Sequence, residues 1–187
     1  TRRVICVIHM GNNGANRTLD NVTIGGVTAA RHNSAATGSA TPNVYFASAV
    51  VPTGTTADVV MTWNNNVFSS PAVSTYTVDD DTLHADGPTV PTVAMVTAAS
   101  ISNSVATVAG SLLMAGVMWT NGTSAKNPVS ITAADETYID DQVGPVTSVW
   151  HVNGAAANAT NDITVGWTDS YAAALGMLTW PMIALGW

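Results

Sequence analysis

Glutamate and lysine, two residues that favour helices, are almost missing from this sequence, and this scarcity constrains the fold more than any other feature. The 187 residues include one glutamate, Glu136, and one lysine, Lys126. Valine and threonine instead recur in short runs that end at glycine, asparagine, proline or aspartate. Because β-branched residues favour strands and the bounding residues favour turns, the pattern predicts an all-β protein.

The apolar runs predict strands that begin roughly every 8–12 residues. The predicted strands are Arg3–His9, Asp20–Ile24, Val27–Arg31, Val44–Val51, Asp58–Trp63, a strand or pair within 67–78, Val93–Ala98, Val105–Ala109, Leu112–Trp119, Val129–Ala133, a strand containing Val146, Trp150 and Val152, Ile163–Trp167 and Ala172–Ile183. We therefore expect an antiparallel β-sandwich of jelly-roll or immunoglobulin-like type, formed as a single domain by residues 1–187.

Three of these runs carry further information. The continuous apolar run of Arg3–His9 is typical of a strand that is buried on both faces. In Asp58–Trp63 the residues Val59, Met61 and Trp63 alternate with smaller or polar ones, which predicts one face toward the core. Leu112–Trp119 also fits a short buried helix, since periodicity cannot separate the two, although we favour the strand.

The composition excludes several classes of protein. Hydrophobic residues make up 47% of the chain and charged residues only 9%. Disordered chains have the opposite balance, so the chain is expected to fold. A net charge of −7 repels phosphate backbones and argues against nucleic-acid binding. The apolar runs are too short for a membrane-spanning helix, so no membrane insertion is expected.

The sequence lacks the motifs of the common hydrolases, metalloproteases and phosphate-binding enzymes. Glycoside cleavage normally uses two carboxylates, and Glu136 is the only glutamate. We therefore expect a non-enzymatic protein, with a hydrolase that uses Glu136 as a remaining alternative. Cys6 is the sole cysteine and lies in an apolar run, which predicts a buried side chain and excludes an internal disulfide.

Two sets of residues have side chains of the types that bind metals. The four histidines lack the short spacing of zinc ligands and are expected at the surface or at strand ends: His9, His32, His84 and His151. Two acidic clusters contain the calcium candidates Asp79, Asp81, Asp140 and Asp141. Neither cluster matches a spaced calcium-binding loop, so we favour solvated acidic turns and expect no cofactor.

Three segments carry a resemblance to a known group of proteins. They are Asn21–Ala29, which contains Thr-Ile-Gly-Gly-Val, Val51–Trp63, which contains Pro-Thr-Gly-Thr-Thr-Ala-Asp-Val-Val-Met-Thr, and Leu178–Trp187. In this order they resemble small β-rich virion structural proteins of tailed bacteriophages and related prophages. The resemblance implies a part of the virion surface, assembled in the bacterial cytoplasm, as a head decoration protein or a tail fibre or spike domain.

The expected partners are copies of the chain itself and other virion proteins. The apolar C-terminal residues are the predicted interface: Trp180, Met182, Ile183, Leu185 and Trp187. Short side chains on the remaining surface agree with this role, because they lose little entropy when they are packed between subunits. The alternative is a carbohydrate-binding module that binds host glycans through Tyr76, Tyr138 or Tyr171 and acidic loop residues.

Overall fold

The computed structural model describes residues 1–10, 18–32, 42–52, 54, 56–64, 71–83, 87–89, 92–120, 130–133, 139–143, 147–155 and 158–183. Within these ranges the regular structure is β-strand apart from one short 3₁₀ turn, η1 (Asp80–Thr82). The strands are β1 (Arg2–Met10), β2 (Leu19–Ile24), β3 (Val27–Thr28), β4 (Ala30–Arg31), β5 (Asn43–Val51), β6 (Val59–Trp63), β7 (Ala72–Asp79), β8 (Thr92–Thr107), β9 (Ser111–Thr120), β10 (Ser130–Ala133), β11 (Ile139–Val143), β12 (Thr147–Ala155) and β13 (Asn158–Trp180).

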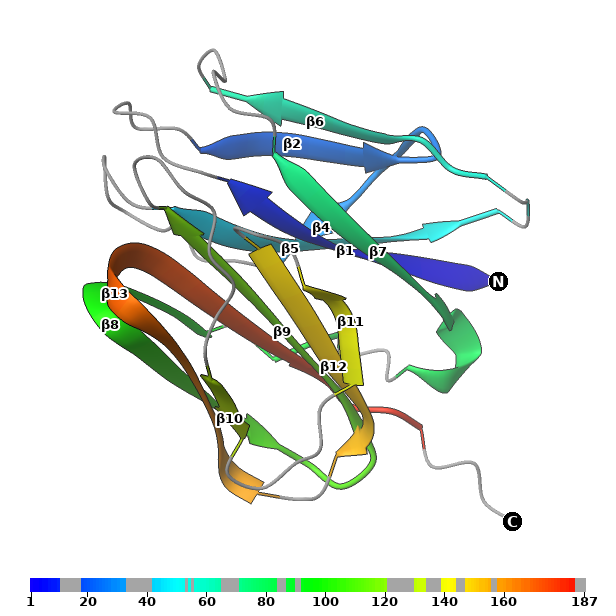
Figure 1. Cartoon of the computed structure of the whole chain (residues 1–187). Coiled ribbons are helices and arrows are strands. Elements are labelled where there is room, and N and C mark those ends of the chain that lie inside the picture. Colours follow the sequence, from blue (N-terminus) through cyan, green and yellow to red (C-terminus); the bar gives the residue numbers. More distant parts are fainter. Residues whose placement is uncertain are drawn as a thin grey trace.

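These strands form three antiparallel sheets that lie in layers (Figure 1). The central sheet has the strand order β4-β5-β1-β7, and the small sheet has the order β3-β2-β6. The large sheet has the order β10-β13-β9-β12-β11, and β8 pairs with β13. Figure 1 shows the small sheet on one side of the central sheet and the large sheet on the other. The prediction of an all-β, antiparallel, single-domain fold is confirmed.

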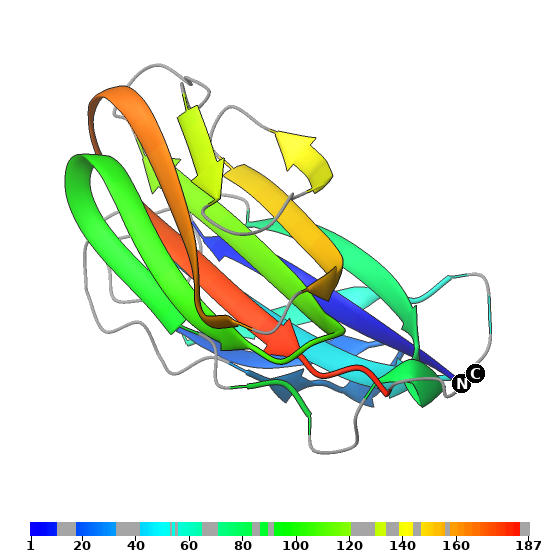
Figure 2. The ribbon, with the colours of Figure 1, turned by 90° about the horizontal axis from the view of Figure 1, so that it is seen from below.

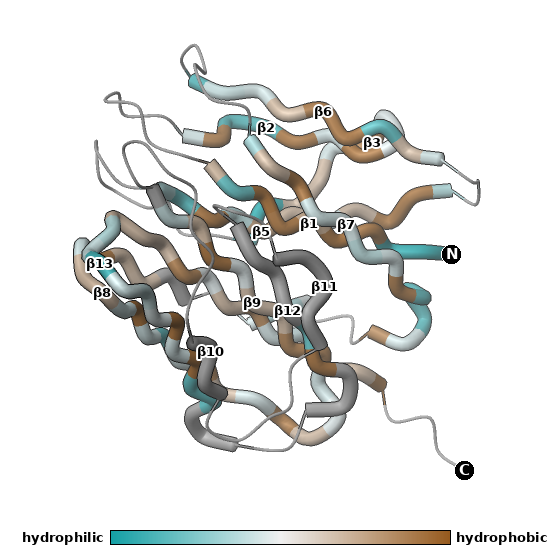
Figure 3. Tube along the Cα trace, viewed as in Figure 1, coloured by the Kyte–Doolittle hydropathy of each residue, from teal (hydrophilic) through white to brown (hydrophobic). Residues whose placement is uncertain are grey.

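Strands β1 and β5 of the central sheet are buried on both faces, which explains their continuous apolar sequences. In β1, Val4, Cys6 and Ile8 pack in the core beneath the small sheet. Ile5 and Val7 alternate with them and pack in the core shared with the large sheet. Figure 3 shows the resulting hydrophobic band along β1 and β5 in the middle of the molecule. The expectation that Arg3–His9 forms a buried strand is confirmed.

The small sheet covers one face of the central sheet. Val59, Met61 and Trp63 of β6 pack against this core, as their alternation predicts, and Val60 between them is 56% exposed. The Trp63 ring meets the Tyr45 ring edge-on at 5.9 Å between centroids. The turn that precedes β3 requires two residues with positive φ, and Gly25 and Gly26 supply them at 57° and 79°.

Two glycines allow the large sheet to approach the central sheet closely. Gly116 of β9 and Gly176 of β13 are directly paired across the two strands. A Cβ atom on Gly116 would lie 2.7 Å from Cγ1 of Val7 and 3.0 Å from Nε2 of His9. A Cβ atom on Gly176 would lie 3.0 Å from both Phe46 and Val44. Only glycine therefore fits at this point between the two layers.

Substitution Gly116→Ala is expected to lower the free energy of unfolding by about 1–3 kcal/mol, because overpacking forces the two layers apart. The measurement is urea denaturation followed by tryptophan fluorescence. Gly54→Ala is the control, since the nearest atom to its added Cβ is 3.9 Å away. Equal effects of the two substitutions would contradict a close packing of the layers at Gly116.

The large sheet differs most from the sequence-based expectation. The predicted strand Val93–Ala98 and most of Val105–Ala109 fall in one long strand, the 16-residue β8. In the same way, Ile163–Trp167 and most of Ala172–Ile183 are joined in the 23-residue β13. Strands β8 and β13 pair along most of their length with a register shift between Gly166 and Tyr171. Figure 2 shows β8 in green and β13 in orange to red bending together.

Because of this bend, the large sheet encloses a core of its own. Ile101 and Val105 of β8 and Ile163 and Val165 of β13 pack against the face of β9 and β13 that points away from the central sheet. An aromatic group closes this core, with ring centroids 5.5 Å apart for Trp119 and Trp167 and 6.0 Å apart for Trp167 and Tyr171. Ser111–Thr120 is a strand and not a helix, as favoured from the sequence.

Candidate functional site

A group of polar contacts surrounds Arg3, where one end of the central sheet meets the end of β13. The Arg3 Nε atom donates a hydrogen bond to Oδ1 of Asp80 at 2.7 Å. The guanidinium carbon lies 4.8 Å from the centre of the Trp180 ring, which is a cation–π contact. Arg3 Nη1 also donates to the Ser48 hydroxyl at 3.4 Å. Arg3 therefore ties β1, β5, η1 and β13 together.

His32 completes this Arg3 cluster, which we define as Arg3, His32, Ser48, Asp80 and Trp180. The His32 Nε2 atom lies 2.8 Å from the Ser48 hydroxyl. Its ring meets the Trp180 ring edge-on at 5.5 Å. Burial and the positive charge of Arg3 lower the pKa of His32 to about 4, so the imidazole is neutral at pH 7.

A serine beside a neutral histidine is the arrangement that activates a nucleophile. Here, however, Ser48 is only 1% exposed in the middle of β5, so a substrate cannot reach its hydroxyl. The carboxylate of Asp80 is bonded to Arg3. The geometry thus fits a structural role, in which the cluster holds the central sheet and the end of β13 together. The sequence did not reveal this cluster, because its members lie far apart in the chain.

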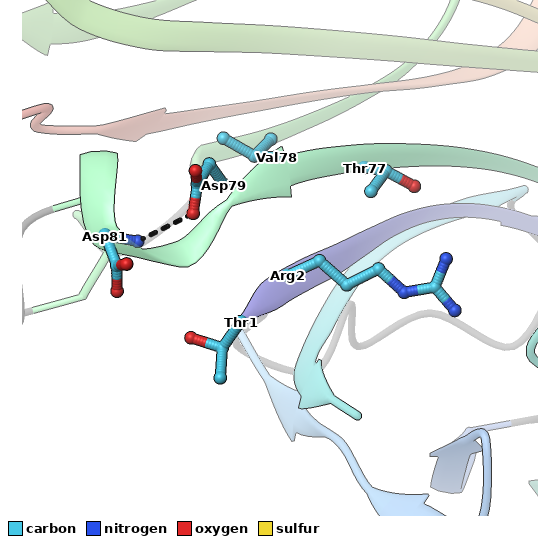
Figure 4. Close-up of a pocket in the computed structure, with 6 residues that line it drawn as sticks. All are labelled: Thr1, Arg2, Thr77, Val78, Asp79 and Asp81. Carbon is cyan, nitrogen blue, oxygen red and sulfur yellow. Dashed lines mark hydrogen bonds between the residues drawn. The ribbon is translucent and has the colours of Figure 1, made fainter. Parts of the chain in front are cut away.

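The first acidic cluster lies at the end of β7. Asp79 and Asp81, with Thr1, Arg2, Thr77 and Val78, line a surface hollow of about 360 Å³ (Figure 4). Asp79 Oδ1 accepts a hydrogen bond from the Asp81 backbone N–H at 3.3 Å, which caps η1. Figure 4 shows the Arg2 side chain pointing away from both carboxylates.

The structure assigns a local role to two of the three neighbouring aspartates. Asp79 acts as the cap of η1, and Asp80 forms the ion pair with Arg3. Within the described ranges, no three side chains of His, Cys, Asp or Glu are gathered where they could hold a metal ion. Calcium binding at Asp79 and Asp81, the alternative to solvated acidic turns, stays untested.

The second acidic cluster lies in a different sheet. Asp140 and Asp141 belong to strand β11, whereas the sequence led us to expect a loop. The β11–β12 pairing is irregular between Asp140 and Gln142, so Asp141 occupies a bulge. Glu136 lies outside the described residues, so the hydrolase alternative that depends on it stays untested.

The histidines and the cysteine are distributed along the chain. His9 lies near the end of β1 but is only 1% exposed, and neither ring nitrogen has a hydrogen-bond partner among the described residues. His151 lies on β12 with its ring 5.6 Å from Tyr76, and His84 lies outside the described residues. Cys6 is buried and free, and burial raises the pKa of its thiol to about 12. His9 thus lies near a strand end, as expected, but is buried and not at the surface.

The residues of the predicted C-terminal interface differ in burial. Trp180 is 2% exposed and belongs to the core between the central and large sheets, so it is enclosed by its own chain. Met182 forms an isolated bridge with Leu83 and is partly buried. Ile183 is 45% exposed, while its backbone N–H donates to the Thr82 carbonyl at 2.8 Å. Leu185 and Trp187 lie outside the described residues.

Neither membrane-spanning helices, within the part of the chain that the structure describes, nor similar known proteins were found. The described residues contain no helix with the length and hydropathy needed to cross a membrane. Comparisons of the chain with protein-family models, with curated proteins and with solved structures found no match.

Proposed function

We propose that this chain is a non-enzymatic structural protein of the bacteriophage virion surface, with capsid decoration and stabilisation as its main role. The observation that supports this proposal is the lack of charge on the exposed faces of two strands, β6 and β8. The exposed side chains described in β6 and β8 are all uncharged, namely Val60, Thr62, Met95, Thr97, Ala99, Ser100, Ser102 and Ala106.

The physical reason is the cost of burying different side chains. Long charged side chains lose rotamer freedom and hydration when a partner covers them, whereas serine, threonine, alanine and valine lose little. Interface cores are correspondingly depleted in lysine, glutamate and aspartate. A surface of this kind suits dense packing against copies of the chain and against other virion proteins.

The layered sheets supply the rigidity that such a role needs. The central and large sheets pack face to face, and we propose this pair as a sandwich of jelly-roll or immunoglobulin-like type, with the small sheet as an added layer. A rigid β-scaffold with its core on both sides of the central sheet resists deformation when it is fixed to a shell. A tail fibre or spike domain has the same requirement and is the nearest alternative.

The test is the location of the chain in phage particles. Particles purified on a density gradient are analysed by mass spectrometry and then labelled with gold-conjugated antibodies raised against the purified chain. We expect the chain in the particle fraction and the label over the heads. Label confined to the tails would favour the tail fibre or spike alternative, and absence of the chain from the particles would contradict the proposal.

The carbohydrate-binding alternative has less support from the described tyrosines. Tyr171 is 8% exposed and packs in the core enclosed by the large sheet. Tyr76 is partly buried against the core between the central and large sheets. Tyr138 lies outside the described residues. Binding of the chain to host-envelope glycans on an array, lost on Tyr138→Ala, would favour this alternative.

A further inference from the structure

Strand β6 forms an edge of the small sheet. One of its sides is hydrogen-bonded to β2, with Val22 opposite Met61 and Thr23 opposite Val60. No other described strand pairs with its second side. Figure 1 shows β6 at the outer margin of the small sheet, beyond β2. The second side therefore presents backbone N–H and C=O groups that another extended strand can bind.

This edge lacks the features by which β-proteins usually prevent association. Edge strands are normally blocked by lysine or another charge, by proline, or by a bulge. The sequence of β6 is Val-Val-Met-Thr-Trp, which contains none of these residues. The register shift of the β2–β6 pairing lies at its far end, between Leu19 and Asn21 of β2.

The strand is also held in the extended conformation that pairing requires. Val59, Met61 and Trp63 pack against the core beneath the small sheet. Val60 and Thr62 point outward and are exposed. Because the inner side chains fix the strand in place, little conformational entropy remains to be lost when a second strand pairs with it.

We propose that two copies of the chain associate through β6, which pairs antiparallel with β6 of the second copy around a two-fold axis at Met61. This register places Val60 opposite Thr62, Val59 opposite Trp63, and Met61 opposite Met61. Inward residues then meet inward residues, and outward residues meet outward residues. The two small sheets become one continuous sheet across the dimer.

The side chains of β6 are complementary to themselves in this register. Pairs of β-branched residues, and of β-branched with aromatic residues, stabilise antiparallel strands when they lie directly opposite each other. The only charge that flanks the strand, Asp58, falls opposite Asn64 and not opposite another aspartate. This matters because each copy has a net charge of −7, and like charges in direct opposition would prevent pairing.

This inference deepens the proposed function, on which it rests, by naming the surface through which copies of the chain meet. A single isologous contact of this kind closes as a dimer and does not grow into a fibre. The dimer then presents the remaining uncharged surfaces of both copies to the shell.

The test is sedimentation velocity over a concentration series of the full chain, supported by light scattering. We expect a species of twice the 19.2 kDa chain mass. Val60→Lys with Thr62→Lys places lysines directly opposite each other and should raise the dimer dissociation constant at least about tenfold. Val60→Lys with Thr62→Glu places lysine opposite glutamate and should restore the dimer. Thr28→Lys, exposed on β3 at the other edge of the same sheet, is the control and should leave it intact.

A covalent trap tests the register directly. Met61→Cys places the introduced thiols opposite each other at the two-fold axis, and the native Cys6 is buried. Oxidation should therefore yield a disulfide-linked dimer of Met61→Cys and none of Thr28→Cys. A monomeric chain, a dimer that resists the two lysines, or an absence of the cross-link would each overturn the β6 pairing. If the chain is monomeric but present in phage particles, the β6 pairing is wrong and the proposed function stands. If the chain forms the β6 dimer but is absent from particles, the proposed function is wrong and the β6 pairing stands.

Discussion

Replacement of Trp180 by alanine is expected to lower the free energy of unfolding by about 3–5 kcal/mol, as for other large aromatic side chains removed from a core. The indole is 2% exposed and packs between the central and large sheets. It also contacts the Arg3 guanidinium at 4.8 Å and the His32 ring at 5.5 Å. The substitution removes all three interactions and leaves a cavity where the end of β13 meets the central sheet. Thermal unfolding should shift downward by roughly 6–20 °C.

The control for this substitution is Ile183→Ala, three residues further along the chain. Ile183 is 45% exposed, and the hydrogen bond to Thr82 uses its backbone, so the change should cost less than about 0.5 kcal/mol. Deletion of Leu178–Trp187 should abolish folding, because it removes Leu178 and Trp180 from the core together. An unfolding midpoint for Trp180→Ala equal to that of the native chain would show that Trp180 is not a core residue.

Much of the fold could be predicted from the sequence because burial leaves a local pattern. The unbroken apolar run of β1 reflects a strand with a core on each face. The alternation in β6 reflects a strand with one exposed face, on which Val60 is 56% exposed. Gly25, Gly26 and Gly110 all have positive φ, as expected for residues at turns. These features depend on neighbouring residues and are therefore visible in the sequence.

The long bent strands could not be predicted, because their central residues resemble loops. The segment between the two predicted parts of β8 is rich in serine and asparagine, which usually indicates a break. In the structure these side chains form hydrogen bonds with β13. Asn103 Nδ2 donates to the Leu175 carbonyl at 2.9 Å, and the hydroxyls of Ser102 and Thr164 lie 2.7 Å apart. Such partners lie more than sixty residues away, so a local pattern cannot identify them.

The Arg3 cluster could not be predicted from the sequence for the same reason. Arg3 and Asp80 are 77 residues apart, and only the antiparallel pairing of β1 with β7 brings η1 to the side of Arg3. The burial of Trp180 likewise depends on how the end of β13 crosses the central sheet. An apolar C-terminal segment indicates burial in general, whereas the three-dimensional fold decides whether its own chain or a partner covers each residue.

Acidification is expected to destabilise the chain through His9. Burial lowers the pKa of His9 from 6.5 to about 4, because protonation would place an unpaired charge between the central and large sheets. The side chain is 1% exposed, and no described residue hydrogen-bonds to either ring nitrogen. Between pH 6.5 and pH 4 the unfolded chain binds a proton at His9 and the folded chain does not. The free energy of unfolding is therefore unaffected by His9 above pH 6.5 and falls as the pH drops toward 4. Between pH 7.5 and pH 4.5 the loss amounts to about 2.5 kcal/mol.

Substitution His9→Met isolates this effect, since methionine has a similar volume and does not titrate. The variant should be at least as stable as the native chain at pH 7.5, because it removes a buried polar group to which no described residue hydrogen-bonds. Its free energy of unfolding, from urea titrations at pH 7.5, 6.5, 5.5 and 4.5, should fall by about 2.5 kcal/mol less than that of the native chain. His32 is half-buried and its pKa is also lowered to about 4, so His32→Gln should reduce the acid-induced loss of stability as well. Measuring His32→Gln alone and together with His9→Met separates the contributions of the two histidines. Should His9→Met lose stability with acid as steeply as the native chain, His9 would not be the residue that makes the contact between the two layers sensitive to pH.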